Sequence, residues 1–333
     1  MTAVCPCIHL ISLGGTISML PPEPGRSVSP CLSGRDMVMS LPDIGTGMEN
    51  GLDVRVEDLH QIPSSHLQFA HLMELSRKIR SLTSENPQAG IVITTGTDTM
   101  EEAAYFIDLT YNGPNPVVFT AAMRHSADIE ADGPRNILES LHVASIPQCR
   151  DLGVLVVMNG QIHAARDVMK LHTSDTGAFQ SPGWGPLGVV NGKTVCMHRS
   201  LRVREYFAVT QPADRVELIK CVLGMDGFVI QALLDRGLDA LVIEALGGGH
   251  VPPSLVEPIK SALDAGVPVV LTSRCLQGGL FVDMYDYAGS ETDLRALGVL
   301  FSSGLSGPKT RIKLALALGA VDDKARLAEH FPG

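Results

Sequence analysis

Near the end of its first third, the chain carries the stretch Gly90-Ile91-Val92-Ile93-Thr94-Thr95-Gly96-Thr97-Asp98-Thr99-Met100-Glu101-Glu102. An apolar run without polar alternation is typical of a strand buried on both faces, as in a parallel sheet. The following apolar residues recur at helical spacing: Ala103, Ala104, Phe106, Ile107 and Leu109. The stretch therefore predicts a buried strand, a polar turn and a helix. Open parallel sheets bind ligands beyond the carboxyl ends of their strands, so the turn is a candidate site.

The polar turn also has a purely structural interpretation, as a helix cap. Thr99 followed three residues later by Glu102 fits a capping box. Thr97 and Asp98 are left over, because one helix start uses one N-cap side chain. A carboxylate near a helix N-terminus is also favoured by the helix dipole, so Asp98 taken alone does not separate the two interpretations.

A second stretch of the same kind lies near the N-terminus, where the apolar residues 8 to 13 end in Gly14-Gly15-Thr16. Two glycines allow a substrate carbonyl to approach the backbone closely, leave amide N–H groups available as oxyanion donors and expose the threonine hydroxyl. The alternative is a phosphate-binding loop. It is disfavoured because the glycines lack G-x-G-x-x-G spacing and a long proline-rich loop follows in place of a helix.

The two turns together resemble the two threonine signatures of the bacterial L-asparaginase family, in Gly14-Gly15-Thr16-Ile17 and in residues 95–101. The similarity continues in family order through four further blocks: residues 116–124, 131–136, 153–159 and 165–170. Residues 174–333 resemble the family more loosely. Six ordered blocks make a chance match improbable.

The resemblance implies roles for individual residues. Thr16 would be the nucleophile, and Thr97, Asp98 and Lys170 would form a hydroxyl-carboxylate-amine relay, in which a lysine can take a proton from a threonine hydroxyl. From its apolar neighbours alone, Lys170 would be interpreted as a stem that extends its amine to solvent.

The resemblance also predicts the residues that hold the substrate. Ser64 matches a family serine that binds the substrate's α-carboxylate, while Ser65 and His66 stand where the family has Gln-Asp. We expect Ser64 and Ser65, with Thr97 and Asp98, to bind the substrate. The structural alternative for Ser64 is the N-cap of the following helix.

The loop over residues 19–35 differs from the family, whose matching loop carries a tyrosine that assists the nucleophile. No tyrosine occurs there, and Arg26 and Ser27 stand at the nearest positions. We hypothesise that Tyr285 or Tyr287 approaches Thr16 across a subunit interface instead, the alternative being that both are ordinary surface or interface aromatics. A further difference is His250, which stands where the family has an asparagine that reaches a neighbouring subunit's site.

Composition limits the classes of partner. The 333 residues include 36 acidic and 26 basic side chains, for a net charge of −10. Nucleic acid and anionic membranes require a basic surface and are disfavoured. No run approaches the roughly 20 apolar residues of a membrane span, and no secretion signal precedes the first strand. Seven scattered cysteines, without zinc-site spacing, predict reduced thiols in a cytoplasmic protein with no metal.

The element pattern predicts an α/β protein of two domains. Residues 1–205 are expected to form a larger N-terminal catalytic domain on a parallel sheet, residues 206–214 a linker and residues 215–333 a smaller, flavodoxin-like α/β domain with alternating strands and helices. Residues 189–195 predict a two-residue hairpin.

These observations predict an amidohydrolase that converts L-asparagine to L-aspartate and ammonia through an acyl-threonine intermediate, with minor glutaminase activity. No organic cofactor is implied, and the family's shared sites imply a homo-oligomer, either a dimer or a tetramer. Two alternatives stay open: the ammonia-producing subunit of a tRNA-dependent amidotransferase, and a non-catalytic amino-acid-binding protein on the same scaffold.

Overall fold

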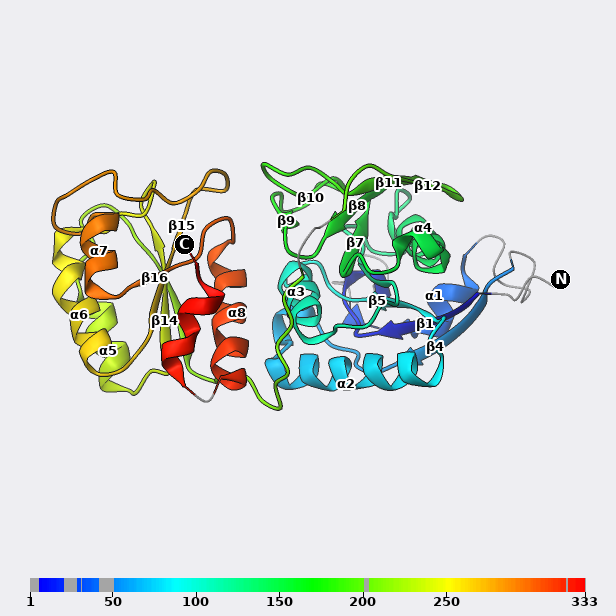
Figure 1. The fold of residues 1–333 in the computed structure, drawn as a ribbon. Helices are drawn as coiled ribbons and strands as arrows, with labels where there is room; N and C mark the ends of the chain where they lie inside the picture. The colour runs from blue at the N-terminus through cyan, green and yellow to red at the C-terminus, as the bar shows by residue number, and fades with distance from the viewer. Residues whose placement is uncertain are drawn as a thin grey trace. The chain divides into compact units, whose positions relative to one another are not determined.

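A computed structural model describes residues 6–20, 29–30, 32–41, 51–200, 204–321 and 323–332, so Arg26 and Ser27 lie outside the described residues. The chain divides into two compact units, Met1–Tyr206 and Phe207–Gly333 (Figure 1). Each unit has its own sheet and its own core, which confirms the predicted α/β class with a larger and a smaller parallel-sheet unit. The linker predicted at residues 206–214 stays a prediction.

The first unit is built on one sheet, which has eight strands among the described residues, in the order β12-β11-β8-β7-β6-β5-β1-β4. Strands β4, β1, β5, β6 and β7 are parallel, and β8, β11 and β12 continue the sheet antiparallel. Their bounds are β1 Cys7–Ser12, β4 Asp53–Asp58, β5 Gly90–Thr94, β6 Val117–Thr120, β7 Val154–Met158, β8 Gln161–Ala164, β11 Gly188–Asn191 and β12 Thr194–Met197. Every residue of β5 is buried, as its apolar run predicted.

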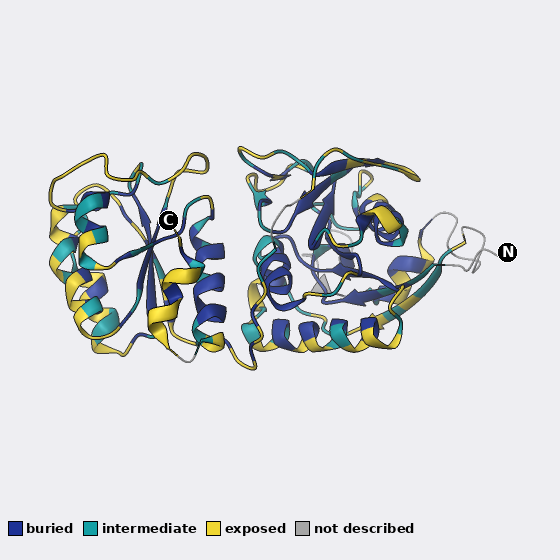
Figure 2. Ribbon diagram, viewed as in Figure 1, coloured by how far each residue is buried: buried dark blue, intermediate teal, exposed yellow. Residues whose placement is uncertain are grey.

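Helices cover this sheet and short elements bring further residues to its edge. The helices are α1 Gly34–Met39, α2 Phe69–Glu85, α3 Met100–Thr110 and α4 Gly133–Ser145, with 3-10 turns at Thr16–Ser18, Ser64–His66 and Pro147–Cys149. Two small hairpins pair β2 Met19–Leu20 with β3 Ser29–Pro30, and β9 Met169–Lys170 with β10 Phe179–Gln180. The burial pattern in Figure 2 is darkest on the central strands and on the helix faces that meet them.

The second unit has four parallel strands among the described residues, in the order β13-β14-β15-β16. They are β13 Val216–Lys220, β14 Ala240–Ala245, β15 Val269–Ser273 and β16 Leu300–Phe301. Helices α5 Phe228–Asp235, α6 Val256–Asp264 and α7 Glu291–Leu297 lie on one face of this sheet, and α8 Gly307–Ala320 and α9 Leu327–His330 on the other (Figure 1). Further 3-10 turns span Pro253–Leu255 and Lys324–Arg326.

The predicted hairpin at residues 189–195 is confirmed, since β11 and β12 pair antiparallel across a two-residue turn. In the part of the chain that the structure describes, no helix combines the length and the apolar character needed to cross a membrane.

Candidate active site

The turn that carries Thr16 is held against the turn after β5 by close backbone packing. Gly15 has φ 91° and ψ 179°, a conformation that is essentially restricted to glycine. A Cβ atom at Gly15 would lie 2.2 Å from the backbone nitrogen of Gly96, and one at Gly14 would lie 2.7 Å from that of Ile62. Gly15 therefore lets the two threonine turns meet backbone to backbone, and Gly14 allows the same close approach by the segment after β4.

Ser64 joins the same cluster from a third segment, which follows β4. A Cβ atom at Gly96 would lie 2.6 Å from the Ser64 hydroxyl, so the buried Ser64 packs directly on the second threonine turn. Because β4, β1 and β5 are parallel neighbours, the segments after them converge at one edge of the sheet. Ser65 lies in the same 3-10 turn, and its side chain is exposed.

Two structural interpretations from the sequence are wrong. The hydroxyl of Thr99 does not close a capping box with Glu102, because it donates instead to the carbonyl oxygen of Ser64 at 2.8 Å. Thr99 is still the N-cap residue of α3. Ser64 is not the N-cap of α2, which begins after Gln68. The Thr99 hydroxyl thus fastens the Ser64 segment to the second threonine turn.

Lys170 brings the predicted relay together from a distant part of the chain. Its Nζ lies 2.8 Å from Thr97 Oγ1 and 2.7 Å from Asp98 Oδ1. The lysine side chain is 17% exposed, whereas that of Asp98 is 70% exposed. The amine is therefore held between a buried hydroxyl and a carboxylate that faces solvent, where that carboxylate can also reach a ligand.

Glu101 has a positioning contribution that the sequence interpretation missed. Its Oε2 accepts the backbone N–H of Lys170 at 2.6 Å, which ties β9 to the first turn of α3. The signal was present in its position, since Glu101 lies in the first turn of α3, directly after the Thr97-Asp98 turn. Thr95 was also missed: its buried hydroxyl has no hydrogen-bond partner among the described residues.

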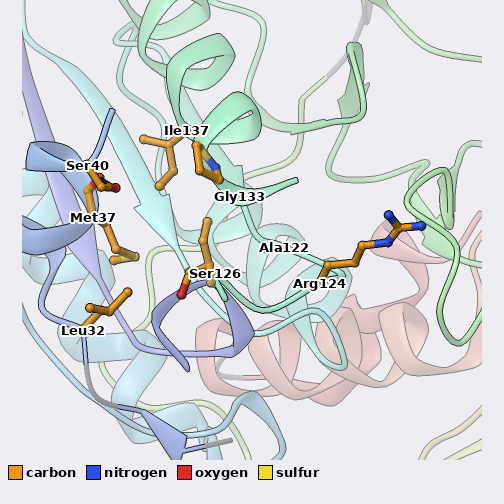
Figure 3. Close-up of a pocket in the computed structure, with 10 residues that line it drawn as sticks. Leu32, Met37, Ser40, Ala122, Arg124, Ser126, Gly133 and Ile137 are labelled. Carbon is orange, nitrogen blue, oxygen red and sulfur yellow. Dashed lines mark hydrogen bonds between the residues drawn. The ribbon is translucent and has the colours of Figure 1, made fainter. Parts of the chain in front are cut away.

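A small cavity is lined in part by Ile17, the residue after Thr16. Figure 3 shows other side chains of its lining. Its volume of about 20 Å³ has room for about one water molecule, and Leu32, Met37 and Ile137 give it an apolar lining. The Arg124 guanidinium points away from the other lining side chains in Figure 3. The cavity is a small packing void beside the Ile17 side chain, and it is too small for an amino acid.

The remaining candidates, His250, Tyr285 and Tyr287, lie in the second unit and form one cluster. The ring centroid of His250 lies 5.2 Å from that of Tyr285 and 5.6 Å from that of Tyr287. His250 Nε2 lies 3.0 Å from Glu291 Oε2. Tyr285 and Tyr287 are 42% and 50% exposed. Their approach to Thr16 of another subunit stays a prediction.

Glu291 organises this cluster, and the sequence interpretation missed it. The fully buried carboxylate accepts the backbone N–H groups of Met284 at 2.7 Å and Tyr285 at 2.8 Å. Desolvation acts to raise the pKa of the Glu291 carboxyl, but hydrogen bonds from these backbone groups, from its own N–H and from His250 hold it below its usual value. The segment that carries both tyrosines is thereby fixed to the start of α7.

Within the described ranges, no group of three or more His, Cys, Asp or Glu side chains could hold a metal ion. The groups brought together at this edge of the first unit's sheet are hydroxyls, the Lys170 amine, the Asp98 and Glu101 carboxylates and backbone N–H groups. Such a set suits acyl transfer to and from a hydroxyl nucleophile.

Comparison with known families and structures gives a consistent result over nearly the whole chain. Residues 7–202 match the family described as "Asparaginase, N-terminal", and residues 215–331 match the "Glutaminase/Asparaginase C-terminal domain".

Individual relatives agree with these matches. An L-asparaginase of Bacillus licheniformis is 35% identical over 94% of this chain and 95% of its own length. The crystal structure of a probable cytoplasmic L-asparaginase from Campylobacter jejuni has a TM-score of 0.86 at 29% identity, and the match covers 98% of this chain and 99% of that one. A glutamyl-tRNA(Gln) amidotransferase component of Methanobrevibacter smithii is 28% identical over 97% of this chain and 74% of its own length.

Proposed function

Because this chain belongs to the asparaginase family, we propose that it is an L-asparaginase, which hydrolyses the side-chain amide of L-asparagine to L-aspartate and ammonia, with a minor activity on glutamine. The observation that carries this proposal is the position of Lys170 Nζ, within 2.8 Å of Thr97 Oγ1 and 2.7 Å of Asp98 Oδ1. This contact supports the proposed relay, which lies next to the turn before Thr16 because Gly15 packs on Gly96.

In the first step, Thr16 attacks the side-chain amide carbon. The hydroxyl loses its proton as the new C–O bond forms, and the oxyanion is held by backbone N–H groups of the glycine turns. The C–N bond then breaks, and the nitrogen takes up the proton that Thr16 released, so that it leaves as ammonia. The product is an ester between Thr16 and the aspartyl group.

In the second step, water replaces ammonia. The pair Thr97 and Lys170 withdraws a proton from the water as it attacks the ester carbon, and the proton is returned to Thr16 when the C–O bond to the enzyme breaks. Aspartate leaves and the enzyme is restored. This route needs no metal and no organic cofactor.

Substrate selection follows from the charges at the site's edge. The exposed carboxylate of Asp98 complements the substrate's α-ammonium group, and we propose that Ser64 and Ser65 hold its α-carboxylate. Since the Asp98 carboxylate also binds Lys170, one residue links substrate binding to the relay. An amide without an α-ammonium group should therefore react poorly.

The assembly belongs to the same proposal. We expect a homo-oligomer, dimer or tetramer, in which the exposed segment around Tyr285 and Tyr287 contributes to the site of another subunit, with His250 at its base. We further propose a cytoplasmic location, as is described for the Campylobacter jejuni protein.

Two other functions remain to be tested against this one. The amidotransferase alternative is favoured by the Methanobrevibacter smithii relative, but this chain spans three quarters of that protein's length and carries a net charge of −10, which is unfavourable for tRNA. A non-catalytic amino-acid binder has no use for the contact between Lys170 and Thr97.

Ammonia release by the purified protein separates the three. The assay uses L-asparagine, L-glutamine, their D-isomers and an asparagine analogue without the α-ammonium group, each with and without tRNA. Release from L-asparagine without tRNA, well above that from L-glutamine, supports the proposal. Release that requires tRNA, or binding without release, would replace it with one of the alternatives.

A further inference from the structure

A second cavity of the first unit lies between the β7–β8 turn and the β9–β10 hairpin, and the proposed reaction uses none of the residues that line it. Its volume is about 360 Å³, within the range of small-molecule sites. Its lining contains amide, imidazole and hydroxyl groups beside one aromatic ring, from Asn159, Gln161, His163, Phe179, Gln180 and Ser181. It is much larger than the apolar cavity beside Ile17.

One side of this cavity is fixed to the core of the unit. Asn159 has φ 49°, one of the few left-handed non-glycine residues in the described chain, and its backbone N–H donates to Asn136 Oδ1 of α4 at 3.1 Å. The next N–H, of Gly160, donates to Glu139 Oε2 of the same helix at 3.1 Å. These two hydrogen bonds fix the turn between β7 and β8 to α4, and the turn forms the side of the cavity that carries Asn159.

The opposite side is the β9–β10 hairpin, which also carries Lys170. Phe179 pairs with Lys170 and Gln180 with Met169 across this hairpin. Ser181 follows directly, and its Oγ lies 2.9 Å from His163 Nδ1. The amides of Asn159 and Gln180 both reach Gly177, so the two walls present hydrogen-bonding groups to the same space.

The chemistry of the lining indicates the class of ligand. None of the lining residues is Asp, Glu, Lys or Arg. The charged side chains next to the lining are already engaged, because Asp175 accepts the N–H of Gly177 and Arg199 donates to the carbonyl oxygen of Gly185. An ionic ligand would therefore lose hydration without gaining a dedicated counter-charge. Side-chain amides offer donors and acceptors together, as do the hydroxyl groups of a sugar. We propose that this cavity binds an uncharged polyhydroxylated molecule of monosaccharide size, and that its occupation alters the position of Lys170 through the β9–β10 hairpin.

The coupling has a direct physical route. A ligand that bonds to both walls fixes the hairpin relative to the β7–β8 turn, and the residue paired with Phe179 is the lysine whose amine contacts Thr97 and Asp98. This second part of the inference rests on the proposed function, whereas the binding site itself does not.

Trp184 provides a binding assay that is independent of catalysis. It is the chain's single tryptophan, it is 60% exposed, and it lies next to the lining residue Gly185. Titration of the full-length protein with D-glucose, D-ribose and glycerol is expected to give a saturable fluorescence change for at least one sugar at millimolar concentration. Sodium acetate at matched osmolarity should give none.

Three variants test whether the sugar that changes the fluorescence binds in this cavity. Gln161→Leu and Gln180→Leu each remove an amide from the lining and should weaken binding about fivefold, the loss expected for one neutral hydrogen bond. Gln88→Leu, an exposed glutamine of the same unit far along the chain from the lining residues, should bind like the wild type. No saturable change with any sugar, or equal affinity in all three variants, would overturn the site.

Kinetics then test the coupling. At a saturating concentration of the sugar that binds, kcat for L-asparagine should change by about fivefold in the wild type, a typical allosteric coupling. The same sugar concentration should have a smaller effect in Gln161→Leu. An unchanged kcat with binding intact overturns the coupling. Absence of any ammonia release overturns the proposed function and leaves the fluorescence result to decide the site.

Discussion

Replacing Lys170 with methionine removes the amine that contacts both Thr97 and Asp98, while keeping a side chain of similar length. The amine lies 2.8 Å from the hydroxyl and 2.7 Å from the carboxylate, so both contacts are lost at once. General acid–base catalysis contributes about 10² to 10⁴ in rate. We therefore expect kcat for L-asparagine to fall by about 10² to 10⁴, which corresponds to roughly 3 to 5 kcal/mol in the barrier.

The same substitution should have little effect on stability. The Asp98 side chain is 70% exposed, so solvent screens the carboxylate of the pair although the Lys170 side chain is only 17% exposed. Pairs with a screened partner contribute about 0 to 1 kcal/mol. Lys78→Met is a matched control, because Lys78 pairs with Glu57 at 2.6 Å on the surface of the same unit. It should lose as little stability and no activity.

Steady-state ammonia release and urea denaturation, measured on both variants, provide the test. A second comparison uses Thr97→Ala: if Thr97 and Lys170 act as one unit, the double variant should be little worse than either single one. A Lys170→Met enzyme within about twofold of wild-type kcat would refute the relay. Losses that simply multiply in the double variant would do the same.

Three further predictions concern the fold and the second unit. Gly15→Ala should lower the free energy of unfolding in urea by roughly 3 kcal/mol, because it adds a Cβ atom 2.2 Å from the Gly96 backbone in a conformation restricted to glycine. The control Gly192→Ala, at φ 57° with open space around it, should lower it by about 1 kcal/mol. Equal losses in the two variants would contradict the packing of Gly15 on Gly96. The pKa of Glu291 in the folded protein lies below its usual value of 4.5. The stability that the ionised carboxylate contributes is therefore present above pH 4.5 and is lost as the pH falls through the lower folded-state pKa. Glu291→Gln should accordingly reduce the loss of stability at acid pH. An acid limb of the pH–stability curve identical to that of the wild type would contradict this. Tyr285→Phe or Tyr287→Phe should lower kcat strongly with oligomer size unchanged, and wild-type turnover in both would exclude either hydroxyl as the partner of Thr16.

The strands and the two threonine turns were predictable because local sequence determines them. The short run Ile91-Val92-Ile93 is made of β-branched residues, which favours a strand buried on both faces over a helix. The pair Gly14-Gly15 favours a backbone conformation that other residues rarely adopt. The resemblance to a known family then supplied Lys170, whose apolar neighbours alone favoured a structural interpretation. Its contact with Thr97 spans 73 residues, a pairing that no local pattern encodes.

What the sequence could not provide were partners chosen by tertiary packing. The Thr99 hydroxyl had a capping partner available in its own helix, yet it bonds to Ser64 because the 3-10 turn after β4 places that carbonyl within reach. Glu291 is polar and lies at a helix start, where an exposed side chain is the usual expectation. Its burial follows from the fold of the segment around residues 284 and 285, whose backbone N–H groups it accepts.

The proposed mechanism requires that Thr16 forms a covalent acyl intermediate and that Thr97 with Lys170 promotes its hydrolysis. Mass spectrometry of the Thr97→Ala protein after reaction with a poor amide substrate tests this most directly, because the variant should still be acylated while hydrolysis of the ester is slowed. We expect the acyl group of that substrate on the peptide that contains Thr16. An adduct found at Thr97 in a Thr16→Ala protein, and none at Thr16 in the Thr97→Ala protein, would contradict it by reversing the two roles.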